Sequence, residues 1–177
     1  KSFLTADNGI VINGDYSSGG GIFLNGDANG IVDGNDTITL AAGITLDTSF
    51  GGGIISLTDT LALGAITLLS GDSLNLNGDF TSSGATLFNV GSSGGAVGLF
   101  TVASGATLDT NGNTLSITAI DVDLQGNIDV GSSDVTISTD DKIQLGDASC
   151  ATCTMNISGA ELQNITAGTL TIDNTGQ

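Results

Sequence analysis

A glycine recurs at nearly constant intervals along the sequence, and this repeat constrains the fold more than any other feature. Successive intervals are 20 to 22 residues long, which gives a period of about 21. A short apolar stretch follows each of these glycines except Gly146, as in Ile44-Thr45-Leu46 and Ile66-Thr67-Leu68. The repeating glycines are Gly21, Gly43, Gly64, Gly84, Gly105, Gly126, Gly146 and Gly168.

Each repeat carries two further apolar segments, one about ten and one about seventeen residues after the glycine. Leu115-Ser116-Ile117 is an example of the first kind and Ile143-Gln144-Leu145 of the second. Apolar and polar residues alternate within the segments, which are rich in Val, Ile and Thr and too short for helices. We therefore expect three short β-strands per repeat, separated by turns of Gly, Asn, Asp and Ser.

A pattern of three strands that recurs every 21 residues is typical of a coil in which each strand stacks on its counterpart one turn earlier. The sequence thus predicts an all-β fold, a parallel β-solenoid, with about eight turns of three strands in one domain over residues 1–177. The alternative is a β-sandwich of hairpins, because Asn-Gly pairs such as Asn77-Gly78 also favour hairpin turns. The residues expected to form a ladder inside the solenoid are Leu46, Leu68, Leu87 and Leu108.

The charge balance and the missing residue types argue against several classes of function. The chain has 19 acidic residues, two lysines and no arginine, which gives a net charge of −17 and no basic footprint for nucleic acid. Without histidine, the sequence cannot form a Ser-His-Asp or Cys-His nucleophilic site. We therefore predict that the protein is not an enzyme. No apolar run approaches the roughly 18 residues that span a bilayer, so we expect neither membrane insertion nor a signal peptide in this chain.

Cys150 and Cys153 are the two cysteines, and their spacing leaves three interpretations open. A local disulfide within a loop is the prediction, and two free thiols are the first alternative. A metal or redox site is the second, although the chain offers neither a second cysteine pair nor a βαβ context. A disulfide would indicate an extracellular or cell-surface location, with which the acidic composition agrees. The alternative interpretation of this acidity is a halophilic protein.

Two groups of acidic residues are candidates for calcium binding. Asp36 lies in Gly34-Asn35-Asp36-Thr37-Ile38-Thr39, which is similar to half of a calcium-binding nonapeptide repeat. In the second group, Asp121 and Asp123 alternate with apolar residues and are expected on one outward face, with Asp129 following. Calcium would offset part of the charge, but no cofactor is required. The alternatives are an ordinary corner for Asp36 and a solvated face for the second group.

Several repeats resemble those of filamentous-haemagglutinin-like and autotransporter-passenger proteins. The similar stretches are residues 74–79, 84–91 and 105–112, and Asn8-Gly9-Ile10 resembles part of the secretion-domain signature of two-partner exoproteins. The resemblance covers nearly the whole chain, but it lies in the general character of the repeats and not in an identifying motif. The proline of the secretion-domain signature is missing. It implies a surface or secreted fibre whose β-helical shaft serves adhesion or spacing, with host or matrix glycans as partners.

Both ends of the sequence, residues 1–5 and 169–173, have the composition of ordinary strands and predict no amphipathic capping helix. The chain is then either an excerpt of a longer coil, with adjoining repeats as partners, or a unit that stacks end to end on copies of itself. The predicted function is a structural, non-catalytic rod module of an extracellular adhesin or fibre. The alternative is a module that binds calcium or carbohydrate along one solenoid face.

Overall fold

The computed structural model describes residues 1–31, 36–91, 98–146, 150 and 152–175. Gly34 and Asn35 of the candidate calcium turn lie outside these residues.

Nearly all of the regular secondary structure in the described chain consists of parallel strands, which form three long sheets, here called A, B and C. Sheet A contains β1 (Ser2–Thr5), β4 (Gly21–Asn25), β7 (Ile54–Leu57), β10 (Leu74–Leu76), β13 (Leu99–Val102) and β16 (Asp121–Leu124). Sheet B contains β2 (Ile10–Ile12), β5 (Ile38–Leu40), β8 (Thr60–Ala62), β11 (Phe80–Ser82), β14 (Thr107–Asp109), β17 (Asn127–Asp129) and β21 (Ile165–Thr166). Sheet C contains β3 (Tyr16–Ser17), β6 (Thr45–Asp47), β9 (Ile66–Ser70), β12 (Thr86–Val90), β15 (Leu115–Thr118), β18 (Asp134–Thr139) and β22 (Thr169–Asn174).

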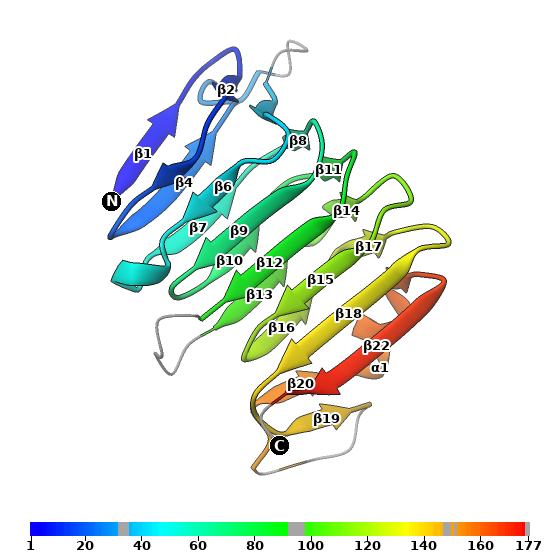
Figure 1. Ribbon diagram of the computed structural model, residues 1–177. Helices are drawn as coiled ribbons and strands as arrows, with labels where there is room; N and C mark the ends of the chain where they lie inside the picture. Colours follow the sequence, from blue (N-terminus) through cyan, green and yellow to red (C-terminus); the bar gives the residue numbers. More distant parts are fainter. Residues whose placement is uncertain (32–35, 92–97, 147–149, 151, 176–177) are drawn as a thin grey trace.

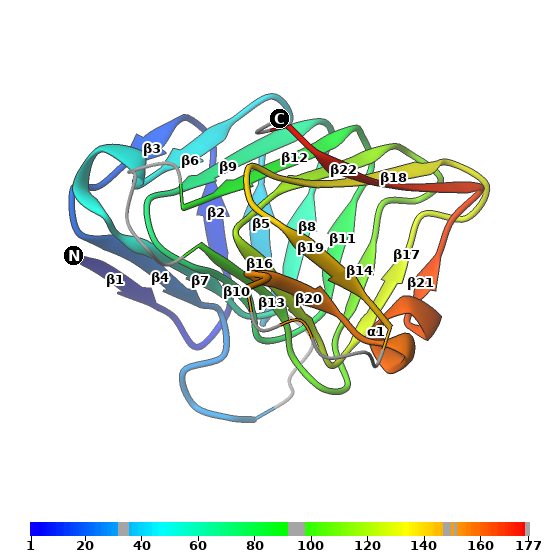
Figure 2. The same cartoon turned by 90° about the horizontal axis from the view of Figure 1, so that it is seen from below.

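The chain visits the sheets in the order A, B, C and then returns to A one level further along the stack (Figure 1). Every strand pair in the three sheets is parallel, and the sheets surround a common interior (Figure 2). The predicted parallel β-solenoid with three strands per turn is therefore confirmed. Sheets B and C each hold seven described strands, which gives seven turns in the described part of the coil, close to the predicted number of about eight. At about 4.8 Å per turn, the stack is roughly 30 Å long.

The interior is filled by the inward-facing residues of all three sheets, and most of them are aliphatic. Three fully buried phenylalanines meet in its middle. Phe88 of sheet C lies 5.6 Å from Phe80 of sheet B and 5.4 Å from Phe100 of sheet A, measured between ring centroids. One aromatic cluster thus joins all three sheets.

The glycine period drifts relative to the sheets. Gly84 precedes a strand of sheet C, whereas Gly105 precedes a strand of sheet B. The drift arises because turns differ in length: Ile22 pairs with Ile55, 33 residues later, but Ile55 pairs with Leu74 only 19 residues later. The period correctly predicted a coil, but it did not assign each strand to its sheet.

Part of the predicted leucine ladder is consequently wrong. Leu46 and Leu68 are buried neighbours in sheet C, as expected. Phe88 takes the next inward position, while Leu87 faces outward with 41% of its surface exposed. Leu108 is buried, but it belongs to sheet B, where it pairs with Phe80.

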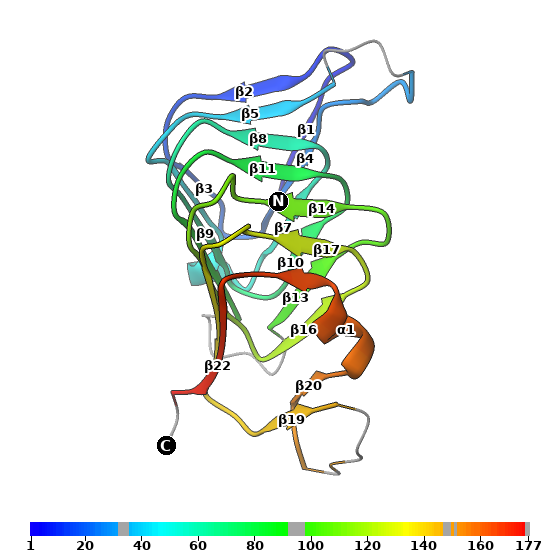
Figure 3. The ribbon, with the colours of Figure 1, turned by 90° about the vertical axis from the view of Figure 1, so that its right-hand side faces the viewer.

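The last turn departs from the regular pattern. After β18, the chain forms β19 (Ile143–Leu145), then β20 (Met155–Ile157) and the short helix α1 (Gly159–Gln163), before it enters β21. β20 contacts β16, and its ladder partner is β19. Figure 3 shows this group at the C-terminal end of the stack. We call β19, β20 and α1 the C-terminal clasp. The predicted terminal strands, β1 and β22, are present, whereas helix α1 was not expected from the sequence.

Candidate functional site

Many of the outward aspartates stabilise the corners of the coil. The carboxylate of Asp59 accepts a hydrogen bond from the amide of Asp79 at 2.8 Å, one turn further along. Asp79 in turn accepts one from the amide of Thr107, also at 2.8 Å. Asp15 does the same for Thr45. These carboxylates connect successive turns where the chain bends and backbone ladders are interrupted.

Asp129 has a local role at its corner. Its Oδ1 accepts a hydrogen bond from the amide of Gly131 at 2.9 Å, the geometry of an Asx turn. Asp129 ends β17 in sheet B, one corner after β16, whereas Asp121 and Asp123 lie in sheet A. The structure therefore separates Asp129 from the other two members of the second candidate calcium group.

Asp121 and Asp123 alternate with the buried Val122 and Leu124, as predicted, yet their surroundings differ. Asp123 accepts a hydrogen bond from the side chain of Gln125 at 2.9 Å. The Oδ1 atom of Asp121 accepts one from the amide of Asn156 in β20, also at 2.9 Å. Asp121 thus lies in the seam between β16 and the C-terminal clasp.

Glu161 occupies the same seam from the other side. Its Oε1 accepts a hydrogen bond from the amide of Leu124 at 3.1 Å, and its Oε2 accepts from the amide of Ser158 at 2.8 Å. Ser158 caps α1, and its hydroxyl accepts a bond from the Glu161 amide, so the two residues form a capping box. Asn164 completes the joint by donating from Nδ2 to the carbonyl of Leu124 at 2.7 Å.

Three side chains therefore connect β16 to the last turn, in a place where the other sheets use backbone ladders. Glu161 is not among the candidate residues predicted from the sequence, although it is the single glutamate in the chain and stands in Ser158-Gly159-Ala160-Glu161. That Ser-x-x-Glu pattern is the sequence signature of a capping box and could have identified both the helix and its anchor.

The environment of Asp121 opposes its negative charge. Burial in the seam raises the pKa of the Asp121 carboxyl, and the nearby Glu161 and Asp123 carboxylates add to the effect. The amides of Asn156 and Val122 donate to the carboxylate and act in the opposite direction. The net shift is upward, so ionised Asp121 is an energetic cost to this joint.

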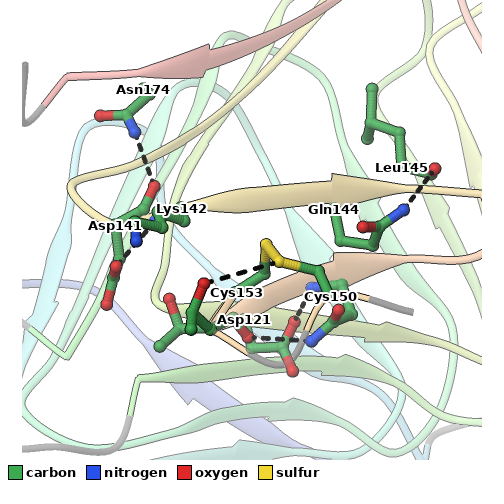
Figure 4. The surroundings of a disulfide bond; sticks show 11 residues. Asp121, Asp141, Lys142, Gln144, Leu145, Cys150, Cys153 and Asn174 are labelled. Atoms are coloured by element: carbon green, nitrogen blue, oxygen red, sulfur yellow. Dashed lines mark hydrogen bonds between the residues drawn. A yellow bond between two sulfur atoms is a disulfide. The ribbon is translucent and has the colours of Figure 1, made fainter. Parts of the chain in front are cut away.

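Cys150 and Cys153 are joined by a disulfide bond in the connection between β19 and β20 (Figure 4). Nearby, the amide of Lys142 donates to Asp141 Oδ1 at 2.7 Å. This bond, the Thr154 hydroxyl and the Lys142 charge lower the pKa of Asp141 below its usual range. The bonded sulfurs leave neither thiol available as a nucleophile or metal ligand.

Asp36 is half-buried at the corner before β5, four turns from β16. Its carbonyl group packs against Gly26, where a larger residue would clash. The described part of the chain contains no group of three or more carboxylate, cysteine or histidine side chains arranged to hold a metal ion. The structure thus does not bring Asp36 together with Asp121, Asp123 or Asp129.

A shallow hollow of about 400 Å³ lies along the edge between sheets B and C. The corners of the third and fourth turns are three residues long there, whereas the corner between β14 and β15 has five. The floor combines small and apolar residues with hydroxyl groups. Among the lining residues are Ala65, Ala85, Leu87, Thr67, Thr114 and Ser116.

No family model, curated protein or solved structure matches this chain. The resemblance to haemagglutinin-like and autotransporter-passenger repeats therefore rests on the sequence texture alone. Among the described residues, no helix is long and apolar enough to cross a membrane.

Proposed function

We propose that this chain is a structural, non-catalytic rod module of an extracellular adhesin or cell-surface fibre. The observation that carries the proposal is the unbroken backbone ladder of sheets B and C, which runs through all seven turns. Such a stack has a stiff axis because every turn is hydrogen-bonded to its neighbours and shares one apolar interior. Several outward carboxylates, such as Asp59 and Asp79, are engaged in holding corners rather than in a cleft.

End-to-end association is the second part of the proposal. Within the part of the chain that the structure describes, strands β1, β2 and β3 of the first turn have a ladder partner on one side only. Their inward residues Leu4 and Ile12 are half-buried against the core. Strand edges of this kind pair readily with further strands, from adjoining repeats or from a second copy.

Electron microscopy and analytical ultracentrifugation of the purified chain test this function. We expect particles that lengthen along one axis as protein concentration rises, with salt present to screen the net charge of −17. Particles that remain monomeric under all these conditions would contradict self-association. Turnover of a polysaccharide by the purified chain would contradict a non-catalytic role.

The hollow between sheets B and C favours a second candidate, the binding of a neutral glycan. Its hydroxyl groups and apolar floor match the two faces of a sugar ring, and none of its lining residues is charged. In glycan-array binding, Leu87→Asp should abolish the signal of the wild-type chain, while Leu63→Asp, at an exposed corner outside the hollow lining, should retain it. A calcium-specific rise in melting temperature, absent with magnesium, would instead support a calcium-binding module.

A further inference from the structure

The seam between β16 and the C-terminal clasp differs from every other contact between successive turns in the described sheets. β17 and β21 are ladder partners, and β18 pairs with β22 through six residue pairs. β16 is the last strand of its sheet, and β20 contacts it without joining the ladder. The seam instead depends on side chains: the carboxylates of Asp121 and Glu161 accept hydrogen bonds from backbone amides across it, and the Asn164 amide group donates one to the Leu124 carbonyl.

We propose that the C-terminal clasp opens and closes over β16 as a unit, independently of the rest of the solenoid. Its two attachments to the coil, β18 and β21, are held by backbone ladders of their own. The clasp can therefore move away from β16 while both attachment strands stay in place. This property is independent of the proposed rod function.

Glu161 is the side chain on which the closed state depends most. One carboxylate joins the Leu124 amide of β16 to the amide and hydroxyl of Ser158 at the start of α1. When this carboxylate is removed, the Leu124 amide in β16 and the Ser158 amide at the start of α1 each lose their hydrogen-bond acceptor. Like charges in the seam favour opening, because the carboxylates of Glu161 and Asp123 both repel that of Asp121.

Apolar contacts keep the clasp closed for most of the time. Met155 and Ile157 of β20 are fully buried against the end of the core, and opening exposes them to water. Opening also uncovers the edge of β16, which belongs to a six-stranded parallel sheet. The unpaired backbone groups of that edge are then exposed to water, so the opening is visible as faster exchange of their amide hydrogens.

Hydrogen exchange of the full chain, measured by NMR or mass spectrometry, tests this opening. Glu161→Ala should speed exchange at the Leu124 amide and throughout β19 and β20 by roughly tenfold, a change equivalent to about 1.4 kcal/mol. Amides of β15 and β18 should keep their wild-type rates, because their ladders do not involve Glu161. Met155→Ala removes part of the apolar contact between β20 and the end of the core, and it should accelerate exchange of the same group of amides.

Asp123→Ala is the matched control, since Asp123 lies in the same strand and its carboxylate accepts from the side chain of Gln125, outside the clasp. It should not speed exchange in the clasp. Because it removes one of the charges that repel Asp121, exchange there should stay at the wild-type rate or become slower. Equal acceleration of β18 and β20 in Glu161→Ala would show that the whole end frays together and would overturn the proposal. Unchanged exchange at Leu124 in both Glu161→Ala and Met155→Ala would overturn it as well.

Discussion

Single side chains in the middle of the core connect all three sheets. Each sheet contributes one fully buried phenylalanine to this cluster: Phe80, Phe88 and Phe100. Phe88 contacts both of the others and stands at the centre of the group. The cavity left by a smaller residue there would loosen all three sheets at once.

Phe88→Ala should therefore lower the free energy of unfolding by about 3–5 kcal/mol, the usual cost of truncating a buried phenylalanine. Urea unfolding followed by circular dichroism measures the change. Phe3→Ala is the control, because Phe3 stacks on Phe23 at the surface with 67% of its area exposed. Its loss should cost about 1 kcal/mol or less. Equal losses in the two variants would mean that the central cluster has no special role.

Asp121 gives a pH dependence whose direction follows from its raised pKa. A carboxyl with a raised folded-state pKa stabilises the fold fully below its unfolded pKa of about 3.9, and this contribution is lost as pH rises through the folded value. At pH 7 the ionised carboxylate is therefore a cost. An asparagine at this position remains neutral, and its side-chain oxygen can still accept a hydrogen bond from the Asn156 amide.

Asp121→Asn should accordingly raise the melting temperature at pH 7 by a small amount, of the order of 1 °C given solvent screening. The difference from wild type should shrink as the pH falls through the raised pKa of folded Asp121, and it should be lost below about 4, where the carboxyl is protonated in both the folded and the unfolded chain. Differential scanning calorimetry across this range, with Asp123→Asn as the control, measures it. A stabilisation that persisted unchanged in acid would exclude ionisation of Asp121 as its cause.

At the scale of the element, the corners decide how closely successive turns approach. A side chain on Gly84 would collide with the backbone of Gly64 and Ala65 in the preceding turn. Gly14 occupies a comparable corner between sheets B and C in the first turn, with open space around it. The same residue type thus has a packing role at one corner and none at the other.

Gly84→Ala is expected to destabilise the protein by about 1–3 kcal/mol, since the two turns must move apart. Gly14→Ala should be neutral or slightly stabilising, because it restricts the unfolded chain without a clash. Thermal unfolding of the two variants side by side makes the comparison. A neutral Gly84→Ala would mean that this corner has more room than its backbone contacts indicate.

For the whole molecule, the dominant electrostatic feature is the net charge of −17 on a compact stack. Repulsion among the carboxylates destabilises the folded state and is screened by salt. Raising sodium chloride from low to moderate concentration should therefore raise the melting temperature by roughly 2–4 °C, equivalent to about 1 kcal/mol. A melting temperature that is constant or falls with salt would mean that favourable charge interactions outweigh the repulsion.

The sequence by itself determined the fold class, because the pattern that produces the coil is repeated along the chain. Alternating apolar residues between glycine-rich corners occur in every repeat, so a strand misassigned in one turn does not change the overall pattern. The inward positions of Leu46 and Leu68 follow directly from this alternation. The absence of histidine and arginine likewise follows from the sequence alone and underlies the proposal of a non-catalytic role.

Only the tertiary structure decided which residues meet across turns. Turn lengths vary, so Phe88 rather than Leu87 continues the ladder, and Leu108 belongs to another sheet. The alternation of apolar residues predicts an outward face for Asp121, but the clasp folds back against β16 and places its carboxylate in a seam with Glu161, 40 residues away. The physical reason is that alternation is a local property, whereas register depends on the length of every connection between distant strands.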